Sequence, residues 1–187
     1  EERYIDQTNL RIDIHRFCKE LLRDQKRTVG RLDSRFQGLD RLHVTERPDF
    51  DPSLTAIMPP YTTMMNQYVR ADLNFKTDLE YEILNGKVLQ AWEYERGTHP
   101  DTSELLRSAF AKNPHMKLLV AQGYYDLATP YFAASYTLNH MGLDPIVRGN
   151  IRTTFYEAGH MMYIDVPSMK KLKSDVSDFL DFALCAF

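Results

Sequence analysis

The strongest constraint on the fold is a short apolar run, LLVA, at residues 118–121. Its residues do not alternate with polar ones, which is the pattern of a strand covered on both faces in a parallel sheet. A second strand is predicted at residues 151–156, where β-branched and aromatic side chains are enriched. Between the two strands, Thr129 and Pro130 predict the start of a helix, which Gly142 ends. This order of strand, helix and strand predicts an α/β fold.

Each predicted strand is followed by a polar residue capable of chemistry. Asp126 follows the first strand, and His160 follows the second, directly after Gly159. Open α/β sheets place their chemistry beyond the carboxyl ends of the strands, so both side chains are expected at that edge. An acid before a histidine is also the chain order of the orienting acid and general base in α/β-hydrolases. By spacing alone, however, Asp126 is better explained as a residue that caps a helix or closes a turn.

The segments that contain these residues are GYYDLATP at residues 123–130, YTLNHMGLDP at 136–145 and YEAGHMMY at 156–163. They closely resemble the C-terminal region of serine carboxypeptidase-like proteins. Upstream, RFCKELLRDQKRTVGRLDSRF at residues 16–36 and YVRADL at 68–73 resemble the helical insertion that caps the active site in that family. The resemblance therefore covers the whole chain.

The resemblance implies a fold, a reaction and a set of site residues. The implied fold is the C-terminal part of an α/β-hydrolase sheet preceded by a mainly helical cap, with residues 1–86 as the cap region and residues 87–187 as the core. Asp126 and His160 match the acid and base of the family's catalytic triad. Met161 matches a residue beside the leaving-group side of the substrate pocket, although from the sequence alone it is simply an apolar packing residue. The implied enzyme is secreted or periplasmic and removes C-terminal residues from peptides.

The third member of such a triad is a serine within a G-x-S-x-G turn, and none of the chain's serines lies between such glycines. We therefore expect these 187 residues to be the C-terminal part of a longer hydrolase and to be inactive alone. Loss of the triad nucleophile costs about a million-fold in turnover in subtilisin. Two alternatives remain open: an esterase or acyltransferase of the same fold, and an inactive interaction module. Glu157 is the alternative acid if Asp126 is not the partner of His160.

Composition argues against several other classes of function. A formal net charge of −3 gives no electrostatic basis for binding nucleic acid or an anionic membrane. No apolar run approaches the roughly 18 residues of a membrane span. The histidines lack metal-ligand spacing such as H-E-x-x-H, so neither a metal nor another cofactor is expected. The expected partners are a peptide substrate and, at an exposed sheet edge near residues 117–122, the missing N-terminal portion or a second copy of the chain.

The rest of the chain gives a series of local predictions. Helices are predicted at residues 9–25, 61–73, 102–112 and after Pro167, a loop at residues 46–60, and a strand or extended segment at residues 88–94. Arg31, Asp33 and Arg35 fit a structural ion-pair cluster better than the lining of a substrate entrance. Cys18 and Cys185 either pair or remain buried thiols.

Overall fold

The computed structural model of the chain describes residues 5–6, 11–42, 44–93 and 101–184. Their strands are β1 (Ile5–Asp6), β2 (Arg11–Ile12), β3 (Arg27–Val29), β4 (Gln37–Leu39), β5 (Leu118–Gly123) and β6 (Ile151–Tyr156). Their α-helices are α1 (Ile14–Glu20), α2 (Pro52–Gln67), α3 (Gly86–Ala91), α4 (Ser103–Lys112), α5 (Tyr131–His140), α6 (Pro145–Arg148) and α7 (Val166–Leu184). None of the helices in these ranges is both long and apolar enough to cross a membrane.

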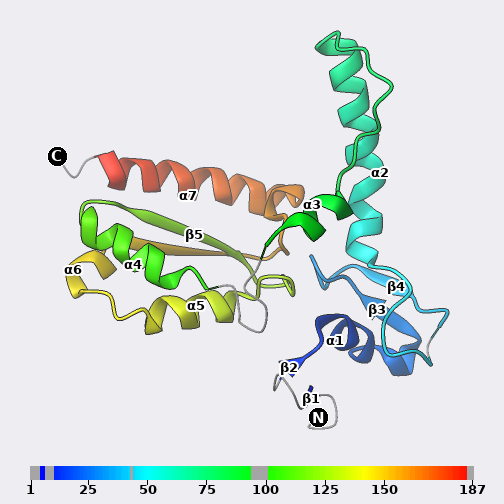
Figure 1. Ribbon diagram of the computed structural model, residues 1–187, viewed down its shortest axis with the longest axis horizontal. Helices are drawn as coiled ribbons and strands as arrows, with labels where there is room; N and C mark the ends of the chain where they lie inside the picture. The colour runs from blue at the N-terminus through cyan, green and yellow to red at the C-terminus, as the bar shows by residue number, and fades with distance from the viewer. Residues whose placement is uncertain (1–4, 7–10, 43, 94–100, 185–187) are drawn as a thin grey trace.

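The C-terminal half is a layered α/β unit built on β5 and β6. The two strands pair in parallel, with Leu118 opposite Ile151 and Gly123 opposite Tyr156. Helix α7 covers one face of the pair, and α4 and α5 lie on the other (Figure 1). Helices lie on both faces, but Leu118, Leu119 and Val120 are only half-buried and Ala121 is exposed. The parallel pairing of β5 and β6 is as the sequence predicts, and the mixture of helices and strands is compatible with an α/β class.

Side chains of β6 contact α7 and hold it against the sheet. The hydroxyl of Tyr156 donates a hydrogen bond of 2.7 Å to Asp175 in α7. The guanidinium of Arg152 lies 3.8 Å from the centre of the Phe182 ring, near the other end of the helix. Residues two apart on a strand share a face, so these contacts and the apolar side of α7 cover the same side of the sheet.

The N-terminal half contains a short helix and an antiparallel hairpin. Asp13 caps α1 by accepting hydrogen bonds from the backbone N–H groups of His15 and Arg16, each 3.0 Å long. The prediction of one helix over residues 9–25 is therefore wrong, because the Asp13 cap starts the helix at Ile14. Strands β3 and β4 pair in the register that places Arg27 opposite Leu39. Cys18 is a buried free thiol, and Cys185 lies outside the described residues.

The structure differs from two further predictions, and in each case a capping residue starts a helix where none was expected to begin. The loop predicted at residues 46–60 ends early, because Asp51 caps α2 and Pro52 occupies its first turn, where a missing N–H is harmless. Helix α2 runs through two interior prolines and projects away from the rest of the molecule (Figure 1). The strand predicted at residues 88–94 is helix α3, which the side chain of Asn85 caps; Tyr94 lies outside the described residues.

Helices α4, α5 and α7 agree with the sequence-based predictions apart from their boundaries. Helix α4 is present, and Asp101 accepts the backbone N–H of Ser103 at its start. Helix α5 begins at Tyr131, after Pro130, and the chain turns at Gly142 with a positive φ of 61°. A Cβ atom is strained in that conformation, so glycine suits the position.

Candidate functional site

The candidate site lies where β5 and β6 end. Because the strands are parallel, the loops that follow them leave from the same edge of the sheet. The backbone N–H of Tyr125 donates to the carbonyl of Ala158 at 3.1 Å, so the two loops are in direct contact. Gly123 permits this approach, since a Cβ atom there would overlap the carbonyl oxygens of Ala158 and Gly159.

The two loops bring Asp126 and His160 together. Oδ2 of Asp126 lies 2.8 Å from Nδ1 of His160, which is hydrogen-bonding distance. The acid is buried, with 5% of its side chain exposed, whereas the histidine side chain is 44% exposed. A carboxylate at Nδ1 favours the tautomer with its hydrogen on Nδ1 and leaves Nε2 free to accept a proton. The pairing expected from the sequence is therefore present in the structure.

Hydrogen bonds keep Asp126 ionised. Its Oδ1 accepts the backbone N–H groups of Ala128 at 2.8 Å and Thr129 at 2.9 Å, and its Oδ2 accepts the Thr129 hydroxyl at 2.5 Å. Burial alone raises the pKa of this carboxyl, but the bonds from Thr129 and His160 outweigh burial and lower the pKa below its ordinary value. Asp126 is thus a carboxylate at neutral pH, as an orienting acid must be.

Thr129 is a further residue of the site. The sequence predicts it as the cap of the following helix, but its hydroxyl contacts Asp126 and lies 3.2 Å from Nδ1 of His160. Its position three residues after Asp126 was the available signal, since an aspartate commonly bonds to the backbone and side chain of residues two and three positions later.

A turn from the N-terminal half completes the site. The carboxylate of Asp33 accepts the backbone N–H of Gly159 at 3.0 Å, and the carbonyl of Leu32 accepts the backbone N–H of His160 at 2.7 Å. Asp33 and Arg35 form an ion pair of 2.7 Å, as the sequence indicated. Among the described residues Arg31 forms no ion pair with Asp33, so this part of the prediction is wrong; the Arg31 carbonyl instead accepts the N–H of Leu127.

The two other candidate residues occupy different surroundings. Glu157 accepts a hydrogen bond of 2.9 Å from the hydroxyl of Tyr125, whereas the ring of His160 bonds to Asp126. Met161 lines a very small cavity together with Phe36, Ile57 and other residues of the N-terminal half. This position agrees with a packing role for Met161, and its contact with a substrate remains a prediction.

Nε2 of His160 has no hydrogen-bond partner within the described part of the chain. Residues 5–6, 11–42, 44–93 and 101–184 place no hydrogen-bonding side chain at Nε2. The same ranges contain no group of three or more His, Cys, Asp and Glu side chains that could hold a metal ion. The site therefore offers a buried acid and an accessible imidazole, and these ranges place no hydroxyl group at Nε2 to act as a nucleophile, since the Thr129 hydroxyl lies at Nδ1.

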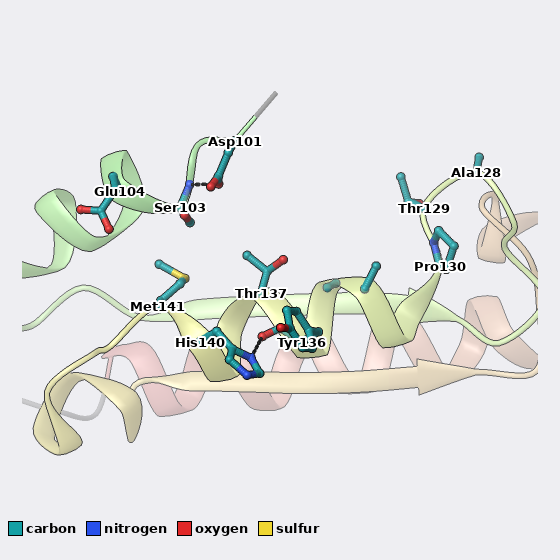
Figure 2. A pocket seen from close by; sticks show the side chains of 12 residues that line it. Asp101, Ser103, Glu104, Ala128, Thr129, Pro130, Tyr136, Thr137, His140 and Met141 are labelled. Carbon is teal, nitrogen blue, oxygen red and sulfur yellow. Dashed lines mark hydrogen bonds between the residues drawn. The ribbon is translucent and has the colours of Figure 1, made fainter. Parts of the chain in front are cut away.

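A hollow of about 760 Å³ adjoins the acid side of the pair. Figure 2 shows it between the start of α4 and helix α5, with Thr129 near one end and Met141 near the other. His140 is also in its wall, where the imidazole stacks on Tyr136 and bonds to the Tyr136 carbonyl at 2.7 Å. His160 does not line the hollow, so the hollow borders the candidate site without containing the base.

Comparison of the chain with protein-family models, with curated proteins and with solved structures found no match.

Proposed function

We propose that this chain is the C-terminal part of a serine carboxypeptidase-like hydrolase and that it supplies the acid and the base of the catalytic triad. The principal support is the distance of 2.8 Å between Oδ2 of Asp126 and Nδ1 of His160. The substrate is a peptide, and the reaction releases its C-terminal residue through an acyl-enzyme.

The proposed mechanism assigns one task to each residue. Nε2 of His160 takes the proton of a serine hydroxyl, whose oxygen then attacks the carbonyl carbon of the last peptide bond. His160 returns that proton to the leaving amine, and in a second round it takes a proton from the water that hydrolyses the acyl-enzyme. Asp126 remains ionised, holds the Nδ1 hydrogen and stabilises the imidazolium that forms.

The serine is proposed to belong to a G-x-S-x-G segment of the protein, which these 187 residues do not contain. The difference in exposure between the pair supports this assignment, because the acid is buried while the imidazole is accessible to a group on another segment. Without the nucleophile and its oxyanion hole, we expect the chain alone to show no measurable turnover.

The test is turnover of a protein that includes the G-x-S-x-G segment, measured on an N-blocked peptide with a free C-terminus. His160→Ala should reduce kcat by about 10⁶-fold, the effect of removing the histidine in subtilisin. His115→Ala is the matched control, because His115 is exposed and lies before β5, outside the candidate site. Turnover that survives His160→Ala would refute the proposal.

A comparison of turnover on a peptide and on a small ester separates the proposed peptidase from an esterase or acyltransferase of the same fold. These enzymes share the triad, so His160→Ala removes activity from each of them. A carboxypeptidase cleaves the peptide as well as a small ester, and it requires the free carboxylate of the peptide. A protein that cleaves only the ester would be assigned to the second class.

A further inference from the structure

We infer that the turn at residues 31–35 positions Asp126 and His160 relative to each other and that Asp33 is its principal positioning residue. This inference rests on the proposed function, because it concerns the same acid and base. The turn acts on the reacting groups only through Asp126 and His160, so its role is one of positioning and not of catalysis itself.

The turn forms backbone hydrogen bonds with both loops of the site. On the acid side, the carbonyl of Arg31 accepts the N–H of Leu127 at 3.0 Å, and the N–H of Ser34 donates to the carbonyl of Tyr125 at 2.9 Å. These bonds hold the residues on either side of Asp126. The loop that follows β5 is thereby fixed to the N-terminal half of the chain.

On the histidine side, the contacts reach the catalytic residue itself. The carbonyl of Leu32 accepts the N–H of His160 at 2.7 Å, and Nη1 of Arg35 donates to the carbonyl of Glu157 at 2.6 Å. One turn therefore holds both loops at once. A shift of the turn would change the distance between the carboxylate and the imidazole.

Asp33 is central to this arrangement because its carboxylate joins the turn to the histidine loop. Only 4% of the residue is exposed, so water cannot readily replace its partners. Its Oδ2 accepts the N–H of Gly159 at 3.0 Å and Nη2 of Arg35 at 2.7 Å, while its Oδ1 accepts the N–H of Arg35 at 3.0 Å. Hydrogen bonding to Asp33 also raises the pKa of Arg35, so its guanidinium stays charged.

The backbone at Gly159 packs directly against the turn, with no space between the turn and the loop that carries His160. A Cβ atom at Gly159 would overlap the carbonyl oxygen of Leu32 and the Cβ of Asp33. Since His160 is the next residue, its backbone cannot move toward the turn. A misplacement of about 1 Å in a catalytic group can cost on the order of 10²-fold in rate, so small changes in this turn should be visible in kcat.

The isosteric substitution Asp33→Asn tests this role. An amide at this position places an NH₂ group opposite the N–H donors of either Gly159 or Arg35, so at least one of these bonds must break. In a protein that includes the G-x-S-x-G segment, we expect kcat to fall on the order of 10²-fold with little change in KM. Asp49→Asn is the matched control, because Asp49 forms an ion pair of 2.5 Å with Arg41 and contacts neither strand end.

A second measurement does not depend on turnover. The ¹⁵N chemical shifts of the His160 imidazole in this chain distinguish the Nδ1–H tautomer from the Nε2–H tautomer. We expect the Nδ1–H form to predominate in the native chain and in Asp49→Asn, and a mixture of both forms in Asp33→Asn. The His160 signals are assigned by their loss in His160→Ala.

If Asp33→Asn does not fold, Arg35→Gln decides the question, because it removes the ion pair and leaves the Asp33 bond to Gly159 in place. It should change the tautomer ratio and kcat in the same direction by a smaller factor. Folded variants with native kcat and native imidazole shifts would overturn the positioning role. If His160→Ala still abolishes turnover in that case, the proposed function stands while this inference fails.

Discussion

At the scale of single residues, the site depends on an aspartate that stays ionised although it is buried. Asp126 has four hydrogen-bond donors, from the backbone of Ala128, the backbone and hydroxyl of Thr129, and the ring of His160. Their combined effect exceeds the penalty of burial and lowers the pKa of the carboxyl. The folded state therefore binds a proton at Asp126 less readily than the unfolded state does.

This difference in proton binding predicts a pH dependence of stability. Above the unfolded pKa of about 4, the ionised Asp126 contributes its full stabilisation, and this contribution is lost as the pH falls through the lower pKa of the folded state. The free energy of unfolding of the native chain should thus exceed that of Asp126→Asn above pH 5, and the difference should shrink below about pH 4. Urea unfolding of both proteins from pH 7 to pH 3 measures it.

The other carboxylates are common to both proteins in this comparison, so their contributions cancel to first order. A difference between the native chain and Asp126→Asn that is the same at every pH would contradict the lowered pKa of Asp126.

At the scale of secondary-structure elements, a buried ion pair joins α1 to the end of the β3–β4 hairpin. Nζ of Lys19 donates to Oδ2 of Asp40 at 2.5 Å and to the carbonyl of Leu42 at 2.8 Å, and both charged side chains are fully buried. Removing one partner of such a pair leaves the other charge buried without compensation. This pair therefore fixes the position of the helix against the hairpin.

We predict that Lys19→Met lowers the free energy of unfolding by about 3–5 kcal/mol, as expected for breaking a buried ion pair. The double variant Lys19→Met with Asp40→Leu should recover much of that loss, because no unpaired charge remains. Arg41→Gln, in the exposed pair with Asp49, is the control and should change the stability little. Equal losses in the single and double variants would show that the charge of Asp40 is not the cause.

The elements also show which features could be predicted from the sequence. The strands at residues 118–123 and 151–156 could be predicted because the first begins with a run of apolar residues and the second is rich in β-branched and aromatic residues. The start of helix α2 and the whole of α3 were missed because their starting signals, Asp51 with Pro52 and Asn85, were outweighed by nearby prolines and aromatic residues.

The candidate site, like the fold, could be predicted from the sequence only in part. Asp126 and His160 each follow a recognisable strand, so their meeting could be expected from parallel pairing alone. The hydrogen bond from Gly159 to Asp33 could not be predicted, because the two residues are 126 positions apart and no local sequence pattern indicates their contact. The ion pair of Asp33 and Arg35 was predictable because its members are neighbours in the sequence.

At the scale of the whole molecule, the described ranges contain a parallel sheet of only two strands. Both outer edges of such a sheet present unpaired backbone groups to any further strand. Large apolar side chains are also exposed around this unit, among them Leu105, Phe132 and Ile146 on α4, α5 and α6. Exposed edges and apolar surface together favour association with another protein segment.

We therefore predict that the isolated chain self-associates. Light scattering over a range of protein concentrations should give a mass that rises from that of one 21.9 kDa chain toward a dimer or larger species. Addition of a polypeptide that contains the G-x-S-x-G segment should compete with this association if the segment occupies the same sheet edge. A monodisperse monomer at all concentrations would contradict the prediction.

The central claim is that Asp126 orients His160 for acid–base catalysis, and kcat of Asp126→Asn tests it most directly. The substitution keeps the shape of the side chain but removes the charge that selects the tautomer of His160. In a protein that includes the nucleophile, we predict a fall in kcat of about 10⁴-fold, the effect of the same acid-to-amide change in the chymotrypsin-type triad. An Asp126→Asn protein that is folded and has native kcat would contradict the account.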